Sequence, residues 1–316
     1  MLDLSSQRIL ITGGAGFLGR AVVDELRARG LSNEQLVIPR RAEHDLVQER
    51  AVVELFASAR PSLVIHLAAR IGGIEANRTH PGSFFHDNMA MGLHLVEHAR
   101  RAGVGKFVHV ATTCAYPRDA ELPLREESLW DGYPEETTAP YGLAKRVLAV
   151  MLDGYRREFG LDSAVLLPAN LYGPGDDFDP TTSHVIPALI RRCEDARREA
   201  LPSITCWGSG RATREFLHVS DAARGVVDAA ERIDSPDPIN LGSGREIRID
   251  ELAQLIAGLV GYTGRIEWDA DRPDGQPRRT LDLRRARERL GWASAITLED
   301  GLASTVAAWR AELARS

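Results

Sequence analysis

The chain has 316 residues, enough for one large domain or two moderate ones with a substantial core. Hydrophobic residues make up 44% of it and charged residues 27%, as in ordinary soluble globular proteins. Its net charge of -6 argues against a general nucleic-acid binder, although local arginines could still hold a small anionic ligand. No apolar run approaches the ~18 residues that a membrane span needs.

The N-terminal segment, MLDLSSQRILITGG, has a short apolar run that passes straight into a glycine loop, so we expect no secretory signal. The three cysteines, Cys114, Cys193 and Cys206, form neither a disulfide framework nor a zinc-ligand spacing. We therefore predict free thiols, no metal site and a cytoplasmic location.

The first half of the chain alternates short apolar strands with helices of ten or more residues. The expected strands are 8–12, 36–38, 62–69, 106–112 and 163–168, and the expected helices are 19–29, 50–59, 84–101 and 141–159. This alternation predicts βαβ units with right-handed crossovers. The fold class is therefore α/β, with a doubly wound parallel sheet of the Rossmann type.

After Asn170 the sequence changes to loops rich in glycine, proline and aspartate, with short strands in ITCW, REFLHV, INLG and RIEW. We interpret residues 1–170 as a nucleotide-binding domain and residues 171–316 as a smaller α+β substrate-binding lobe. Residues 215–242 are expected to return to the first domain. No linker or low-complexity tract separates the two parts, so they should pack together.

Three glycines at three-residue spacing, Gly13, Gly16 and Gly19, directly follow the first expected strand. Such glycines permit a tight turn, close approach of the backbone to a pyrophosphate, and close packing of the next helix on the sheet. The free N–H groups at that helix start then meet the phosphates. An ordinary glycine turn is the alternative, but the strand before and the helix after favour a dinucleotide.

The end of the second expected strand distinguishes NAD from NADP. An acidic residue there suits the ribose hydroxyls of NAD, whereas an arginine suits the 2′-phosphate of NADP. Here Arg40 and Arg41 follow the strand, and no acid occurs before Glu43. The sequence favours NADP over two merely solvated arginines. Asp45 and Leu46 are candidates to border the adenine.

Tyr141 and Lys145 are four residues apart in TAPYGLAKR, so a helix places both on one face. A free tyrosine has a pKa near ~10, and a neighbouring ammonium should lower it. The phenol could then give a proton to a carbonyl oxygen as hydride arrives from a nicotinamide. Y-x-x-x-K is common by chance, but its distance after a dinucleotide loop favours catalysis.

The motifs TGGAGFLG, HLAA and Y-x-x-x-K, with a strand ending at Thr112, together resemble the extended short-chain dehydrogenase/reductase family. That family has a catalytic Ser or Thr just after a central strand, four residues before a tyrosine. Thr112 matches, with Tyr116 marking the spacing, and its hydroxyl would hydrogen-bond the keto oxygen of the substrate. A strand-end threonine can also simply bond its own backbone. The resemblance further implies cofactor contacts from Phe17, Leu18, Ala68, Ala69, Tyr141, Lys145, Pro168, Asn170 and Leu171.

Longer blocks resemble the GDP-L-fucose synthase family, whose members are GDP-4-keto-6-deoxymannose 3,5-epimerases and 4-reductases. The blocks are RIGGIEANRTHPGSFFHDN, TTCAYP, LWDGYPEETTAPYGLAKR, NLYGPGDDFDPTTSHVIPALIRR, WGSGRATREFLHVSD and RPDGQPRRTLD. This resemblance implies conversion of GDP-4-keto-6-deoxy-D-mannose into GDP-L-fucose with NADPH. It also implies a homodimer, formed through the helices expected at 84–101 and 141–159.

The same resemblance implies two more catalytic residues, Cys114 and His184. A ketone at C4 acidifies the hydrogens on C3 and C5, and inversion needs one group that accepts a proton and another that donates one on the opposite face. A thiol of pKa ~8.5 and an imidazole near ~6.5 both titrate close to neutrality. A small buried cysteine and a polar helix-start residue are the structural alternatives.

Substrate contacts are implied as well, and arginine suits a pyrophosphate. The implied residues are Asn170, His184, Arg192, Trp207 and Arg214.

Two departures leave other functions open. Thr112 stands where fucose synthases usually have serine, and the GGAGFLG loop is a generic one. A 4-ketoreductase or epimerase of a dTDP-, UDP- or modified GDP-sugar is one alternative, and a non-catalytic NADP-binding sensor is another. A dehydratase is disfavoured, because Thr113 and Cys114 stand where related dehydratases have an Asp-Glu pair.

Overall fold

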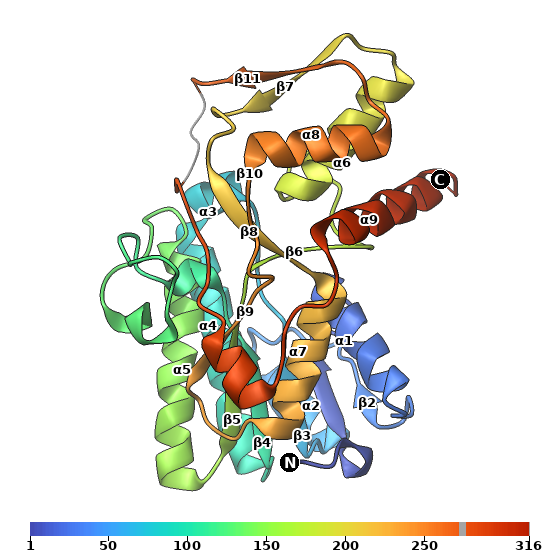
Figure 1. Ribbon diagram of the computed structural model, residues 1–316. Helices are drawn as coiled ribbons and strands as arrows, with labels where there is room; N and C mark the ends of the chain where they lie inside the picture. Colours follow the sequence, from blue (N-terminus) through green and yellow to red (C-terminus); the bar gives the residue numbers. More distant parts are fainter. Residues whose placement is uncertain (272–275, 316) are drawn as a thin grey trace.

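The computed structural model describes residues 1–271 and 276–315, and it places a sheet-based lobe below a smaller lobe in the view of Figure 1. The main sheet has six parallel strands in the order β2-β1-β3-β4-β5-β9. They are β1 (Ile9–Thr12), β2 (Leu36–Val37), β3 (Leu63–His66), β4 (Lys106–Val110), β5 (Asp162–Pro168) and β9 (Pro238–Leu241). The predicted doubly wound parallel sheet is confirmed.

Helices form the outer layers of this sheet. The helices α1 (Phe17–Ala28) and α7 (Val219–Arg232) pack together, whereas α2 (Glu49–Ala59), α4 (Pro81–Arg101) and α5 (Ala139–Phe159) form a second group. The short α3 (Ile74–Thr79) precedes α4. Because both faces are covered, the strands are apolar almost throughout, and β1 and β3 are buried at every residue.

The long helix α5 is bounded by residues that favour helix ends. Pro140 lies in its first turn, where a missing N–H costs nothing, and Gly160 ends it in the left-handed region at φ 72°. Its buried face includes Lys145 and Leu148, while Val147 and Val150 stay exposed. One face of α5 is therefore directed into the lobe, and that face carries the lysine of the expected catalytic pair.

In the described part of the chain, the upper lobe contains two small sheets and three helices. The strands β6 (Asn170–Tyr172), β8 (Thr213–His218) and β10 (Glu246–Arg248) form one sheet, and β7 (Ser203–Trp207) pairs with β11 (Arg265–Asp269) in the other. The helices are α6 (Val185–Arg198), α8 (Ile249–Val260) and α9 (Leu298–Leu313). This lobe has a hydrophobic core of its own, built from residues such as Ile190, Ile204, Ile256 and Leu302.

The expected return of residues 215–242 to the first domain is wrong at its start. Residues 215–218 belong to β8, which pairs with β6 and β10 in the upper lobe, whereas α7 and β9 lie in the main lobe. A later segment also reaches the main core, through Leu281, Leu290 and Trp292. The domain boundary at residue 170 stays a prediction.

Two expected strands end earlier than their apolar patterns. β3 ends at His66 and β4 at Val110, so Ala68, Ala69 and Thr112 lie in loops at the carboxyl edge of the sheet. This edge is where parallel α/β sheets bind ligands, next to the point where the strand order reverses. That point lies between β1 and β3.

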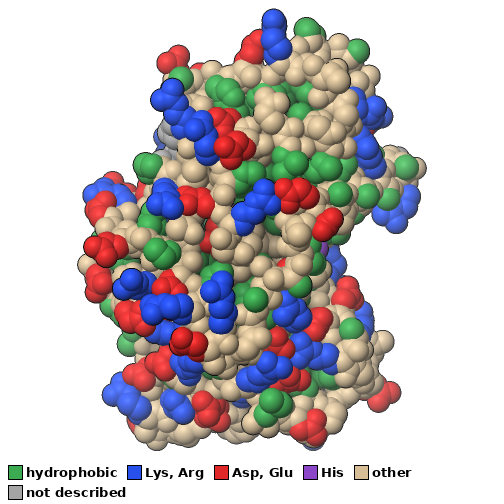
Figure 2. All heavy atoms as spheres, viewed as in Figure 1, with side chains coloured by type: hydrophobic (Ala, Val, Ile, Leu, Met, Phe, Trp, Pro, Cys, Tyr) green, Lys and Arg blue, Asp and Glu red, His purple; other side chains and the backbone are tan. Residues whose placement is uncertain are grey.

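The surface carries both signs of charge. On the face shown in Figure 2, basic and acidic side chains are interspersed over both lobes. Within residues 1–271 and 276–315, no helix is long and apolar enough to cross a membrane. The cytoplasmic location stays a prediction.

Candidate active site

The glycine loop lies between β1 and α1, and it leaves no room for a Cβ at Gly13 or Gly19. Gly13 has φ +72°, and a Cβ on it would lie 2.7 Å from the backbone nitrogen of Ala68. A Cβ on Gly19 would lie 2.0 Å from the carbonyl oxygen of Gly13. Gly16 is the residue before α1 and has no side chain to cap that helix. This loop therefore fits a pyrophosphate, which would take the place of a capping side chain at the helix start.

The other residues expected at the cofactor are spread along the same edge of the sheet. Phe17 and Leu18 open α1, Ala68 and Ala69 follow β3, and Pro168, Asn170 and Leu171 lie at and after the end of β5. Arg40 and Arg41 are exposed beyond β2, followed by the half-buried Asp45 and the buried Leu46. Their individual contacts with a cofactor stay predictions.

The structure brings Thr112, Cys114 and Tyr141 together. The Thr112 hydroxyl accepts a hydrogen bond from the Cys114 N–H at 3.2 Å, in the turn that leads into the 3₁₀ helix η2 (Thr113–Ala115). The side chain of Tyr141, in the first turn of α5, also forms a hydrogen bond with Thr112. The Thr112 hydroxyl thus bonds the nearby backbone, which was the purely structural alternative for this residue, and it also contacts Tyr141.

The expected acidity of Tyr141 is not found in the chain alone. Burial raises the pKa of the phenol above its ordinary value, the Cys114 thiol raises it further, and only the bond with Thr112 opposes them. Lys145 is buried, and its Nζ donates to the carbonyl oxygens of Val110 at 3.1 Å and Ala68 at 3.4 Å. Burial lowers the pKa of Lys145 to about 7. The prediction that its ammonium lowers the pKa of Tyr141 is therefore wrong for this state.

The pKa of Lys145 makes stability depend on pH. The unfolded lysine keeps its proton up to its ordinary pKa of 10.5, whereas the folded one loses it near pH 7. The folded chain therefore binds fewer protons between these values, so burial of Lys145 costs most stability below pH 7 and less as the pH rises. We therefore expect Lys145→Met to raise the free energy of unfolding, relative to wild type, by more at about pH 6 than at about pH 9. Urea unfolding of the cofactor-free chains measures this, with Arg157→Met as a surface control; an equal difference at both pH values would contradict it.

Two buried histidines, His66 and His109, lie beside Lys145, and neither is among the predicted site residues. His109 Nε2 lies 3.0 Å from the carbonyl oxygen of Lys145, and His66 Nδ1 lies 2.8 Å from the Thr12 hydroxyl. Their rings stack with centroids 5.7 Å apart. Burial and the nearby lysine lower the pKa of both, that of His109 to about 3, so both rings are neutral at physiological pH. In the sequence each appears as a polar residue within an apolar strand, and His66 also begins the HLAA motif.

Cys114 is half-buried and has a basic neighbour. The Nη1 atom of Arg279 lies 3.8 Å from the Cys114 sulfur. Arg279 belongs to the block RPDGQPRRTLD, which the resemblance singled out without giving this residue a role; residues 272–275 of the block lie outside the described residues. The arginine was missed because only the folded chain brings it to the thiol.

The remaining predicted site residues belong to the upper lobe. His184 is the residue before α6, and its side chain is exposed at the surface. Desolvation of the ring by neighbouring protein atoms lowers its pKa, and the Asp177 carboxylate opposes this shift. Arg192 donates to the Thr205 carbonyl oxygen at 2.5 Å, and Trp207, at the end of β7, is 67% exposed. These positions belong to other elements than Thr112, Cys114 and Tyr141.

Two other predicted substrate residues lie on neighbouring strands. Asn170 on β6 donates to the carbonyl oxygen of Glu215, at 3.1 Å. Arg214 on β8 donates to the Thr213 carbonyl oxygen at 2.7 Å. The two strands pair in parallel, so both residues belong to one small sheet.

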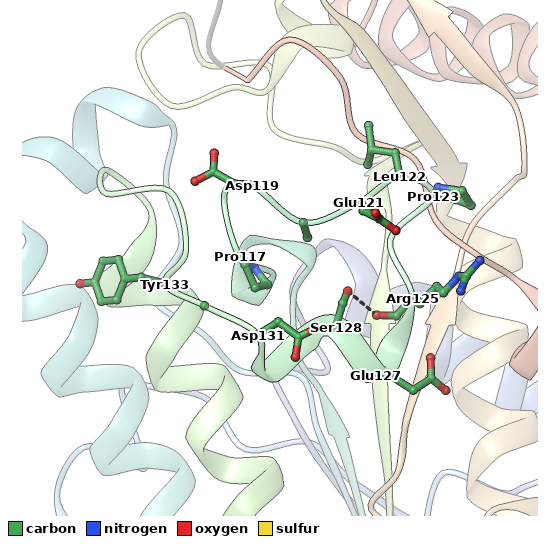
Figure 3. Close-up of a pocket in the computed structure, with 12 residues that line it drawn as sticks. Pro117, Asp119, Glu121, Leu122, Pro123, Arg125, Glu127, Ser128, Asp131 and Tyr133 are labelled. Atoms are coloured by element: carbon green, nitrogen blue, oxygen red, sulfur yellow. Dashed lines mark hydrogen bonds between the residues drawn. The ribbon is translucent and has the colours of Figure 1, made fainter.

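A cavity of about 490 Å³ lies within the loop from Pro117 to Tyr133 (Figure 3). None of the predicted catalytic, cofactor or substrate residues lines it. Its lining includes exposed charged residues such as Asp119, Glu127 and Asp131. We therefore place the candidate active site at the carboxyl edge of the sheet and not in this cavity.

Comparison with known proteins shows which family the chain belongs to. The model of the NAD dependent epimerase/dehydratase family matches residues 9–242. GDP-L-fucose synthase of Escherichia coli K12 is 41% identical over 96% of both chains. A GDP-L-fucose synthetase of Naegleria fowleri bound to NADP superposes with a TM-score of 0.92, at 28% identity over 100% of this chain and 96% of the other.

A third protein is a GDP-mannoheptose C4 reductase of Campylobacter jejuni with NADP bound. It has a TM-score of 0.89 and 28% identity over 98% of this chain and 100% of its own. The resemblance to the extended short-chain dehydrogenase/reductases is confirmed by these matches. The chain belongs to the NAD dependent epimerase/dehydratase family, and it is similar over nearly its whole length to the GDP-L-fucose synthases.

Proposed function

We propose that the chain is a nucleotide-sugar 3,5-epimerase and 4-ketoreductase that converts GDP-4-keto-6-deoxy-D-mannose into GDP-L-fucose with NADPH. The observation that carries this proposal is the contact group of Thr112, Cys114 and Tyr141 beside Lys145. A reductase needs only the hydroxyl, the phenol and the lysine. The thiol in the same group is what a simple reductase would not need. The 41% identity to GDP-L-fucose synthase supports the same substrate.

The chemistry of each side chain follows from the ketone at C4. Cys114 and His184 remove and return protons at C3 and C5, which the carbonyl group makes acidic. Thr112 and Tyr141 hydrogen-bond the oxygen at C4 and stabilise the negative charge that develops there. Bound NADPH supplies the hydride for reduction at C4. Tyr141 then gives its proton to that oxygen, and reduction traps the inverted sugar.

The cofactor would be held by the glycine loop and selected at the end of β2. A Cβ at Gly13 or Gly19 would fill the loop, and the α1 N-terminus after Gly16 has no capping side chain. Arg40 and Arg41 are exposed where the 2′-phosphate of NADP is expected in this fold. The NADP-bound relative from Naegleria fowleri supports the same choice.

Removing both arginines should weaken the preference for NADP. We expect the double substitution Arg40→Ser and Arg41→Ser to raise the Kd of NADPH by about tenfold or more and to leave that of NADH within about twofold, because a charged hydrogen bond contributes roughly 1.5–3 kcal/mol. Fluorescence titration with both cofactors measures it. Arg50→Ser, on the exposed surface of α2, is the control. Equal losses for both cofactors would contradict the assignment.

The function itself is tested with GDP-4-keto-6-deoxymannose and NADPH. The expected result is oxidation of NADPH together with GDP-L-fucose as the product. A dTDP-4-keto-6-deoxy sugar serves as the control for the nucleotide. If no keto-sugar supports NADPH oxidation, the proposed enzymatic function is wrong, and a non-catalytic NADP-binding sensor is the function that remains.

Reduction without epimerisation is the second candidate. The observation in its favour is the likeness to the GDP-mannoheptose C4 reductase, with a TM-score of 0.89. In that case the GDP-sugar is reduced at C4 and the configurations at C3 and C5 are unchanged. Product stereochemistry distinguishes the two candidates in the experiment above.

We also propose a homodimer formed through α4 and α5. These helices pack on each other and expose apolar side chains at Phe85, Leu93, Val147 and Val150, each between 41% and 53% exposed. Val150→Glu should shift the chain from dimer to monomer, because it would bury a charge in the interface. Light scattering after gel filtration measures this. Val53→Glu on α2, 46% exposed in wild type, is the control, and a wild-type monomer would contradict the proposal.

A further inference from the structure

The helix that carries Tyr141 and Lys145 also holds the turn that carries Cys114. Gly142 and Arg146 are one helical turn apart on α5, so they share a face of it. A Cβ at Gly142 would lie 2.3 Å from the carbonyl oxygen of Cys114, so the turn Thr113–Ala115 lies directly against the helix there. The same helix therefore sets the positions of the phenol and of the thiol.

Arg146 connects this turn to the loop that follows it. Its Nη1 atom lies within hydrogen-bonding distance of three carbonyl oxygens: 3.2 Å from Ala115, 2.7 Å from Leu129 and 3.1 Å from Gly132. Its guanidinium also lies over the ring of Trp130, 5.5 Å from the centroid. Arginine suits this role, because its rigid, permanently charged group can serve several acceptors at once.

The loop held by Arg146 closes on itself close to the thiol. Pro117 pairs with Pro134 in an isolated antiparallel bridge, and the Arg118 N–H donates to the Tyr133 carbonyl oxygen at 3.0 Å. Pro117 is three residues after Cys114, so the closed end of the loop is next to the catalytic turn. Figure 3 shows this loop, from Pro117 to Tyr133, folded around its cavity. Further along, the loop is held to the rest of the main lobe, where Leu124 pairs with Leu281 and the Glu126 carboxylate accepts from the Asn240 N–H at 2.9 Å. The Arg146 contacts, at the end of η3 (Glu126–Trp130), tie the loop to the catalytic turn itself.

We propose that Arg146 is a positioning residue for proton transfer at Cys114, a role that rests on the proposed epimerase function. By joining the Ala115 carbonyl oxygen to those of Leu129 and Gly132, it fixes the Thr113–Ala115 turn on α5 and thereby the thiol relative to Tyr141. Tyr141 and Lys145 are held by the helix itself and by the contacts with Val110 and Ala68, so reduction depends much less on Arg146.

The substitution Arg146→Met keeps an unbranched side chain with a similar apolar stem and removes the charged guanidinium. We expect deuterium exchange at C3 and C5 in heavy water to fall by roughly 10²-fold, the scale of an error of about 1 Å at a reacting group. Reduction at C4 should fall by less than about threefold, so unepimerised C4-reduced sugar should be part of the product. Arg146→Lys keeps the charge but not the rigid, planar guanidinium, so it should lie between.

The matched control is Arg157→Met on the same helix, where Arg157 is 75% exposed and pairs with Asp153 at 2.7 Å. It should change neither rate. If Arg146→Met lowers exchange and reduction by the same factor, Arg146 has only a structural role and the proposal is overturned.

A second measurement does not depend on the enzyme's activity. Alkylation of Cys114 by iodoacetamide, followed by mass spectrometry in the cofactor-free chain, should be several-fold faster in Arg146→Met than in wild type or Arg157→Met. The buried Cys193 and Cys206 serve as internal references for global unfolding. If the wild type shows no exchange at C3 or C5, the proposed function fails, and only the alkylation rate of Cys114 then tests Arg146. An alkylation rate in Arg146→Met equal to that of wild type overturns the positioning role, and a faster one supports it.

Discussion

Replacement of Tyr141 by phenylalanine should lower the rate of NADPH oxidation with the keto-sugar by roughly 10²–10⁴-fold, the usual contribution of one positioned proton donor. The substitution keeps the ring in the first turn of α5 and removes only the hydroxyl that bonds Thr112. Because burial raises the pKa of this phenol in the chain alone, the group holds its proton until the oxygen at C4 becomes basic enough to take it.

The measurement is the steady-state rate at saturating NADPH, followed by its absorbance. Tyr133→Phe is the control, because that tyrosine is 62% exposed in the loop before α5 and its substitution should not change the rate of NADPH oxidation. A Tyr141→Phe enzyme with reduction within about threefold of wild type would remove the phenol from the mechanism.

Replacement of Cys114 by serine should separate the two activities. We expect reduction to continue and epimerisation to stop, so that the product is a C4-reduced sugar with unchanged C3 and C5. The physical reason is the pKa of the side chain: a thiol titrates near neutrality and a serine hydroxyl does not. Serine also keeps the size of the side chain, so the turn on α5 should be preserved.

Product stereochemistry and deuterium content measure this separation. Cys193→Ala is the control for loss of a thiol elsewhere, because Cys193 is buried in the core of the upper lobe. The inverted product at the full wild-type rate from Cys114→Ser would show that the thiol assignment is wrong.

The sheet, the glycine loop and the Tyr141–Lys145 helix could be predicted because their signals are local. Gly13 and Gly19 stand at fixed spacing after an apolar strand, and Pro140 and Gly160 bound α5 in the sequence itself. Strand ends were less predictable, since apolar residues continue past His66 into the loop that contains Ala68. The interpretation also missed β10, which has only three residues.

The electrostatics of the site could not be predicted from spacing. The pattern Y-x-x-x-K shows that two side chains share a helix face, but it does not show what surrounds them. In the structure the Lys145 ammonium is buried against two carbonyl oxygens, so its own pKa falls and the phenol gains nothing from it. Arg146 and Arg279 were missed for the same reason, because their contacts with the Cys114 turn and its thiol come from chain segments that are distant in sequence.

The proposed catalytic residues come from both lobes. The Thr112, Cys114 and Tyr141 group belongs to the main lobe, while His184 precedes α6 in the upper lobe. We propose that the substrate binds between them, with its ketone at the main lobe and its nucleotide near Arg192 and Trp207. A single-lobe site would need no contribution from His184.

The central claim is that one site exchanges protons at two carbons and reduces the carbon between them. Its most direct test is the reaction of GDP-4-keto-6-deoxymannose with NADPH in heavy water, with the product examined by NMR. The claim predicts deuterium at both C3 and C5 and consumption of NADPH. Consumption of NADPH with no deuterium at either carbon would contradict it and leave a simple ketoreductase.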